Sequence, residues 1–146
     1  MRKIDTSRIL KNSLNKSGYF VGLSKNKKQK THYIHQLVAR EWVSNPSEKR
    51  CVDHIDGNRA NNHHENLRYA THAENSRNMK KHADGSSVYK GVYMCNRRHK
   101  WVASIHTNMG HKHLGMFSNE REAAESYNIA AVKYFKEFAK LNILID

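Results

Sequence analysis

The pattern of apolar and polar positions predicts the elements in the first half of the chain. Residues 19–24 are rich in apolar side chains and are predicted as a strand, a lysine-rich turn follows, and residues 29–34 are predicted as the returning strand, which together predict a β-hairpin. Residues 35–43 carry apolar side chains at helical spacing and therefore predict a short helix. Trp42 lies on the apolar face of that helix, so we expect it to anchor the core rather than to bind a ligand.

The second half of the chain shows three more strand-like segments and one long helical stripe. Strands are predicted over 88–94, 100–106 and 112–117, separated by turns rich in asparagine, arginine and glycine. Ser118 is the predicted N-cap of the following helix, whose first turn holds acidic residues that suit the positive helix end. The stripe expected to pack on one face of the sheet comprises Ala123, Tyr127, Ala130, Ala131, Tyr134 and Phe138.

Polar segments separate these elements. The N-terminal residues hold few apolar side chains and are expected to form a loosely anchored arm. A later segment contains glycine and paired serines, which is typical of a linker. The predicted organisation is a basic arm at 1–18, a first domain at 19–79, a linker at 80–87 and a second domain at 88–146.

Positive charge is concentrated in two blocks of the chain. The formal net charge is +13 and the sequence pI is about 9.9. Residues 1–50 and 80–113 carry net charges of +9 and +6, whereas residues 51–79 and 114–146 carry −1 each. An excess of lysine and arginine on this scale favours a nucleic-acid partner, with an ordinary solvated surface as the alternative.

Low hydropathy and few cysteines argue against several classes of protein. The mean hydropathy is −0.89, and no apolar run reaches membrane-spanning length, so no membrane partner is expected. No secretory signal pattern follows Met1. Cys51 and Cys95 form no CxxC pair, which argues against a disulfide framework or a zinc knuckle.

Candidate chemistry lies between residues 52 and 78. Asp53 and His54 precede an Asp-Gly turn, and a capping-box pattern further on predicts a short helix that carries Asn75. The oxygens of Asp53 and Asn75 are hard ligands of the kind that Mg²⁺ takes. A histidine with an ordinary pKa of about 6.5 can accept a proton from water at neutral pH. This set suits hydrolysis of a phosphodiester with one metal ion.

The succession of Asp53-His54, Asn66 and Asn75 resembles the HNH motif of the ββα-metal nucleases, in the variant found in phage and intron homing endonucleases. The resemblance implies that His54 is the general base and that Asp53 and Asn75 hold one Mg²⁺ or Mn²⁺ ion. It also implies that Asn66 is the central asparagine, whose side chain ties the loop to the strand. The alternative, a hydrated hairpin turn, accounts for Asp53 and His54 but not for both asparagines.

Residues 88–142 resemble the AP2 domain, a DNA-binding module of three strands and one helix. The resemblance rests on Tyr89-Lys90-Gly91-Val92, Lys100-Trp101-Val102-Ala103 and Leu114-Gly115-Met116-Phe117, with Tyr127 on the helix. It implies that the open face of the sheet enters the major groove. The alternative is a sheet that binds protein or only stabilises the nuclease.

Two sets of residues are predicted to contact DNA. The set that the AP2 resemblance implies is Lys90, Tyr93, Cys95, Arg97, Arg98, Ser104, His106, His111 and His113. The set at the tip of the hairpin is Lys25, Lys27, Lys28 and Lys30, for which an ordinary solubilising turn is an equal alternative.

These inferences combine into one predicted protein. Its fold class is α+β: an N-terminal β-hairpin with a ββα-metal HNH nuclease domain, a linker, and a C-terminal three-stranded antiparallel sheet packed on one helix. Its predicted function is site-specific, metal-dependent cleavage of double-stranded DNA, as a monomer that nicks and needs no protein partner. A cytoplasmic location is expected, in the host cell if the protein is phage-encoded. The alternatives are a non-cleaving DNA-binding regulator and a nuclease selective for junctions or RNA.

Overall fold

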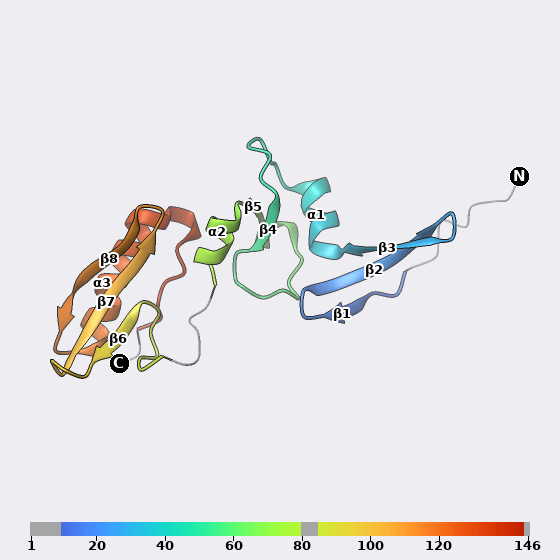
Figure 1. Ribbon diagram of the computed structural model, residues 1–146. Helices are drawn as coiled ribbons and strands as arrows, with labels where there is room; N and C mark the ends of the chain where they lie inside the picture. The colour runs from blue at the N-terminus through green and yellow to red at the C-terminus, as the bar shows by residue number, and fades with distance from the viewer. Residues whose placement is uncertain (1–9, 80–84, 145–146) are drawn as a thin grey trace, which may run out of the picture. The chain divides into compact units, whose positions relative to one another are not determined.

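The computed structural model describes residues 10–79 and 85–144. The chain divides into two compact units, residues 1–71 and 72–146. Both combine helices and antiparallel strands, so the predicted α+β class is confirmed (Figure 1). Of the predicted arm and linker, residues 1–9 and 80–84 lie outside the described residues.

The first unit begins with a three-stranded antiparallel sheet in the order β1-β2-β3 (Figure 1). Its strands are β1 (Ser13–Asn15), β2 (Gly18–Lys25) and β3 (Lys28–Tyr33). The turn between β2 and β3 has φ values of 52° at Asn26 and 62° at Lys27, and two central residues with positive φ match the twist of a tight hairpin. The predicted hairpin is therefore present, and the short β1 adds a strand that the sequence analysis assigned to the arm.

Helix α1 (Ile34–Trp42) follows β3 directly, close to the predicted bounds. Within the helix, Ala39 is fully buried, whereas Trp42 is 71% exposed. The prediction that Trp42 anchors the core is wrong. Trp42 is the last residue of the helix, and its ring stacks on that of His64 at 6.0 Å instead of entering the small core.

The rest of the first unit is a two-stranded antiparallel ribbon of β4 (Cys51–His54) and β5 (Leu67–Ala70). A long loop joins the two strands and ends in the short 3-10 helix η1 (His64–Asn66). The strands start and end opposite one another, because the register pairs residue 51 with 70 and residue 54 with 67.

The second unit starts with the short helix α2 (His72–Arg77) and contains a sheet in the order β6-β7-β8. Helix α3 lies across one face of that sheet, and the turn η2 follows it (Figure 1). The bounds are β6 (Val92–Cys95), β7 (Lys100–Thr107), β8 (Gly110–Phe117), α3 (Glu120–Phe135) and η2 (Lys136–Phe138).

Small residues on α3 let the helix lie close to the sheet. Four alanines of the helix are buried, together with Tyr127 and Phe135. Tyr134, which the predicted stripe included, is 36% exposed, and its neighbour Phe135 takes the buried position. The predicted N-cap Ser118 is also wrong by one residue, because the side chain of Asn119 accepts the Arg121 N–H at 2.8 Å.

Gly91, just before β6, lies against Tyr127 of α3. Its φ is +75°, and its carbonyl accepts the Ser104 N–H at 2.8 Å. A β-carbon built at Gly91 would overlap the ring of Tyr127 and come within 2.6 Å of the Ser104 carbonyl oxygen. No side chain larger than hydrogen fits there without displacing the helix.

Gly91→Ala should therefore lower the free energy of unfolding of the second unit by about 2–4 kcal/mol, from overlap and backbone strain together. Gly110→Ala is the matched control, since φ is +101° there but a β-carbon meets nothing within 4 Å. It should cost about 1–2 kcal/mol, the strain alone. Urea unfolding followed by Trp101 fluorescence in a Trp42→Phe background measures both, and equal losses would show that the close approach is not limiting.

Candidate active site

The β4–β5 ribbon presents different side chains on its two faces. Side chains alternate along a strand, and directly paired residues share a face. Val52 and His54 therefore lie on one face, and Asp53 lies on the other with its partner Arg68. Asp53 and His54 are only 5% and 7% exposed.

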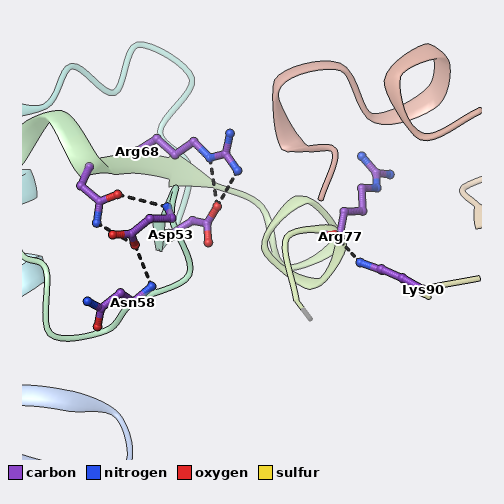
Figure 2. Close-up of polar contacts among 7 residues, drawn as sticks. Asp53, Asn58, Arg68, Arg77 and Lys90 are labelled. Carbon is purple, nitrogen blue, oxygen red and sulfur yellow. Dashed lines mark hydrogen bonds and ion pairs between the residues drawn. The ribbon is translucent and has the colours of Figure 1, made fainter. Parts of the chain in front are cut away.

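Arg68 supplies the countercharge for the buried carboxylate of Asp53 (Figure 2). Its Nε and Nη2 atoms donate to Oδ2 of Asp53 at 2.9 and 2.8 Å, and the Arg68 side chain is 15% exposed. A carboxylate buried to this degree needs such a partner to stay ionised at low cost. The two bonds fix the carboxylate at the edge of the ribbon.

His54 is held by the loop that follows it. Its Nε2 lies 3.0 Å from Oδ1 of Asn62. With the amide oxygen as acceptor, Nε2 carries the proton of the neutral ring and Nδ1 is the basic nitrogen. The contact therefore sets which atom of His54 can accept a proton.

The asparagine-rich loop is closed by Asn66. Its Nδ2 donates to Oδ1 of Asp56 at 3.0 Å and to the Asn61 carbonyl at 2.8 Å, while its Oδ1 accepts the Asp56 N–H at 3.1 Å. Asp56 also accepts the Asn58 N–H at 2.7 Å (Figure 2). An Asn61 side-chain N–H donates to the other oxygen of this carboxylate at 2.9 Å. One carboxylate and one amide thus tie the loop to the ends of both ribbon strands.

A second histidine, His35 at the start of α1, packs against His54. The two ring centroids are 5.2 Å apart at an interplanar angle of 63°, and the Tyr33 ring lies 5.6 Å from that of His35. Burial lowers the pKa of His35, and His54 and Arg59 lower it further. Its Nδ1 is buried and has no hydrogen-bond partner among the described residues. Sequence reasoning missed His35, because a histidine in a helical pattern carries no signal of its tertiary contacts.

The donors for a metal ion are only partly assembled in the first unit. Among residues 10–79 and 85–144, no group of three histidine, cysteine, aspartate or glutamate side chains could hold a metal ion. The Asp53 carboxylate is a hard oxygen donor, and its two oxygens offer about four lone-pair sites. It therefore fits a divalent cation, which would share the carboxylate with Arg68. Asn75 lies on α2, and its assignment as a ligand stays a prediction.

The predicted DNA contacts fall into exposed and engaged groups. Lys27, Lys28 and Lys30 of the hairpin are exposed, and the side chain of Lys25 lies outside the described part of the chain. In the second unit the exposed residues are Tyr93, Arg97, Arg98, His106, His111 and His113, whereas Cys95 and Ser104 are half-buried.

Lys90 is placed differently from the other predicted contacts. Its Nζ donates to the carbonyl of Arg77 at 2.6 Å, at the end of α2 (Figure 2). It also donates to the carbonyl of Met79 at 2.7 Å. Burial lowers its pKa, with a further contribution from Lys140. A cation at a helix C-terminus satisfies carbonyls that lack helical partners, so this geometry suits a structural role.

Comparisons with known proteins assign one segment of the chain to a family. A family model described as HNH endonuclease matches residues 32–77, which run from the end of β3 to the end of α2. An uncharacterized HNH endonuclease L560 of Acanthamoeba polyphaga mimivirus is 35% identical over 129 residues, 88% of this chain and 65% of that protein. Residues 32–77 of the chain therefore form an HNH endonuclease segment. HNH nucleases generally use a divalent metal ion.

Further relatives of this HNH protein extend the comparison. DNA endonuclease I-HmuI of Bacillus phage SP01 is 41% identical over 77 residues, 52% of this chain and 44% of that protein. The AP2-like ethylene-responsive transcription factor AIL7 of Arabidopsis thaliana is 44% identical over 52 residues, 34% of this chain and 10% of that protein. The HNH chain thus has an AP2-like region, and it spans less than two thirds of each of these relatives.

Two negative findings complete this description. No solved structure matches the HNH chain significantly. Within the described residues, no helix is long and apolar enough to cross a membrane.

The carboxylate of Asp56 gives the loop a testable pH dependence. Burial raises the pKa of this group, but the hydrogen bonds from the Asn58 backbone and from the Asn61 and Asn66 side chains outweigh it and hold the pKa below 3.8. A depressed folded pKa adds stability that is present above the unfolded pKa and lost as pH falls through the folded pKa.

Asp56→Asn should therefore be less stable than the parent at pH 7, and the difference should shrink as pH falls below about 4. Urea unfolding at a series of pH values, followed by circular dichroism, measures it. Glu48→Gln, a change at an exposed carboxylate outside the loop, should give no such trend. A difference for Asp56→Asn that does not shrink on acidification would contradict the role of the carboxylate.

Proposed function

We propose that this HNH endonuclease hydrolyses a phosphodiester bond of double-stranded DNA at specific sites and that it nicks as a monomer. The observation that carries the proposal is the pair Asp53 and His54 at the end of β4, both buried and each held by a separate partner, Arg68 and Asn62. One site per chain favours a single-strand nick. The proposed place of action is the cytoplasm of the cell that holds the DNA.

The proposed chemistry assigns His54 as general base. Its Nδ1 takes a proton from water, the water oxygen attacks phosphorus, and the bond to the leaving oxygen breaks. Asn62 keeps the ring in the tautomer that this step needs, and Asn66 keeps the loop in place. A bound Mg²⁺ or Mn²⁺ would neutralise charge on the leaving oxygen; Asp53 and, from the sequence motif, Asn75 are its proposed ligands.

Two surfaces are proposed to bind the DNA. The hairpin lysines would contact phosphates, and the exposed arginines and histidines of β6 to β8 and their turns would lie in a groove. The open sheet face supports this role, because the opposite face is covered by α3. Likeness to an AP2-like transcription factor supports it as well. The affinity should fall as salt rises, because about 0.9 counterion is released for each phosphate that the protein neutralises.

A DNA-binding regulator on an inactive HNH scaffold is the second candidate. The AP2-like region favours it, since AIL7 is named as a transcription factor. The two candidates differ in one measurable property, because only the endonuclease breaks DNA.

His54→Ala should lower the rate of plasmid nicking by about 10²–10⁴-fold, the usual contribution of a general base. DNA affinity, measured by fluorescence anisotropy, should change little. His64→Ala is the matched control, an exposed histidine of the same loop outside the proposed chemistry. Nicking by His54→Ala at the parental rate would remove His54 from the mechanism.

Removing divalent ions should abolish cleavage without abolishing DNA binding. In the presence of EDTA the parent should bind labelled duplex but leave supercoiled plasmid intact, and Mg²⁺ or Mn²⁺ should restore nicking. The regulator binds under both conditions and never cuts. Undiminished nicking in EDTA would exclude metal-dependent hydrolysis.

A further inference from the structure

A cavity of about 360 Å³ lies in the first unit, between α1, the end of β3 and the β4–β5 ribbon. Its lining brings together two guanidinium groups, one imidazole and two phenol rings. These belong to Arg40, Arg50, His32, Tyr33 and Tyr69. No aspartate or glutamate is among the lining residues. A hollow with positive and aromatic walls and no acidic side chain suits an anion that carries a flat ring.

The cavity lies on the same face of the ribbon as His54. Tyr69 and Val52, which line it, are directly paired across the strands, and His54 is two residues beyond Val52 on that face. Two residues of a strand span about 7 Å. The candidate general base is therefore one residue pair away from the cavity wall.

Ring contacts join the cavity to His54 by a second route. Tyr33 forms part of the wall and contacts the His35 ring at 5.6 Å, and His35 contacts the His54 ring at 5.2 Å. A ligand seated against Tyr33 would therefore press on the side chains that pack behind the base. The series of ring contacts thus runs from the cavity wall to His54.

Arg40 stands at the rim of the cavity, ready to exchange partners. It pairs with Glu41 at 3.3 Å, but the two side chains are 69% and 65% exposed. Such a surface pair contributes little, so a phosphate can displace it. A guanidinium binds phosphate through two parallel N–H bonds, which lysine cannot reproduce, and a tyrosine ring can stack on a base of any sequence.

We propose that this cavity is a nucleotide subsite, which holds a phosphate and the adjoining base of the DNA strand next to the bond that is cut. Arg40 and Arg50 bind the phosphate, and Tyr33 and Tyr69 flank the base. The subsite rests on the proposed nuclease function and extends it, because it selects a strand whose base next to the cut is unstacked. An apolar side chain lacks the negative charge that the two arginines would bind, and an acidic peptide lacks the base that the two tyrosines would flank.

The first experiment measures plasmid nicking with Mg²⁺ by the full chain. Arg50→Gln should raise KM about tenfold with kcat within about threefold of the parent, since a charged hydrogen-bonded contact is lost. Arg50→Lys keeps the charge but loses the paired bonds, so it should show most of that rise. Lys11→Gln removes one charge from an exposed position outside the cavity and should change KM by less than about threefold. Equal effects of Arg50→Gln and Lys11→Gln would overturn the subsite.

The aromatic half of the subsite has its own pair of variants. Tyr69→Phe keeps the ring and should nick with a KM near that of the parent, whereas Tyr69→Leu should raise KM because the base loses its stacking partner. Urea unfolding of both proteins controls for loss of structure in the ribbon. A folded Tyr69→Leu protein with the parental KM would show that no base lies against this wall.

Direct binding separates failure of the subsite from failure of the nuclease. The probes are 5′-phosphorylated thymidine tetranucleotide and inorganic phosphate, titrated into His54→Ala protein and followed by NMR. Shifts at Arg50 and Tyr69 with the tetranucleotide, but weaker with inorganic phosphate, support a nucleotide subsite even if the parent does not nick. Equal shifts with both probes would reduce the cavity to a phosphate site. Shifts confined to the hairpin lysines would overturn the proposal while leaving the nuclease intact.

Discussion

The structure of the first unit depends on a carboxylate that is kept charged while 95% of its surface is covered. Asp53 is 5% exposed, and an unpaired charge at that depth would destabilise the fold. Arg68 on the neighbouring strand neutralises this charge, and the register of only four residue pairs places it opposite Asp53. A one-residue slip would put Arg68 on the face of His54 and leave Asp53 alone. Pairing of the charges and alignment of the strands are thus one constraint.

The asparagines extend that constraint into the loop. Neutral amides can donate and accept at once, so Asn66 bonds to Asp56 in both directions, and Asn62 orients His54 without adding charge. This explains how a segment of near-zero net charge can order a dense group of polar side chains. In a nuclease, the charge that the phosphate meets would then come from the bound ion and from Arg40 and Arg50, not from the loop itself.

Sequence patterns predicted most helices and strands correctly, because these elements are determined by residues that are close together in the chain. The hairpin tip, the start of α2 and the strands of the second sheet depend on turn residues and alternation, which are readable from neighbours in the sequence. Trp42 and Tyr134 were assigned wrongly because one residue decides whether a side chain near a helix end faces the core. Ser118 was assigned wrongly because the helix begins one residue later, with Asn119 as its N-cap. Arg68, His35 and Lys90 could not be read at all, since their partners are 15 residues away for Arg68 and 13 and 11 for Lys90, and 19 positions away for His35.

The distribution of aromatic rings then separates what folds the first unit from what would bind DNA. Tyr33 and His35 pack in series behind His54, and Tyr33 also lines the cavity that a ligand can reach. Trp42 and His64 stack on the surface, where they contribute little to the core. A unit this small cannot bury all its rings, and the two tyrosines that line the cavity share it with Arg40 and Arg50. Aromatic and guanidinium groups placed together on a small, weakly apolar scaffold are what recognition of an unstacked nucleotide requires.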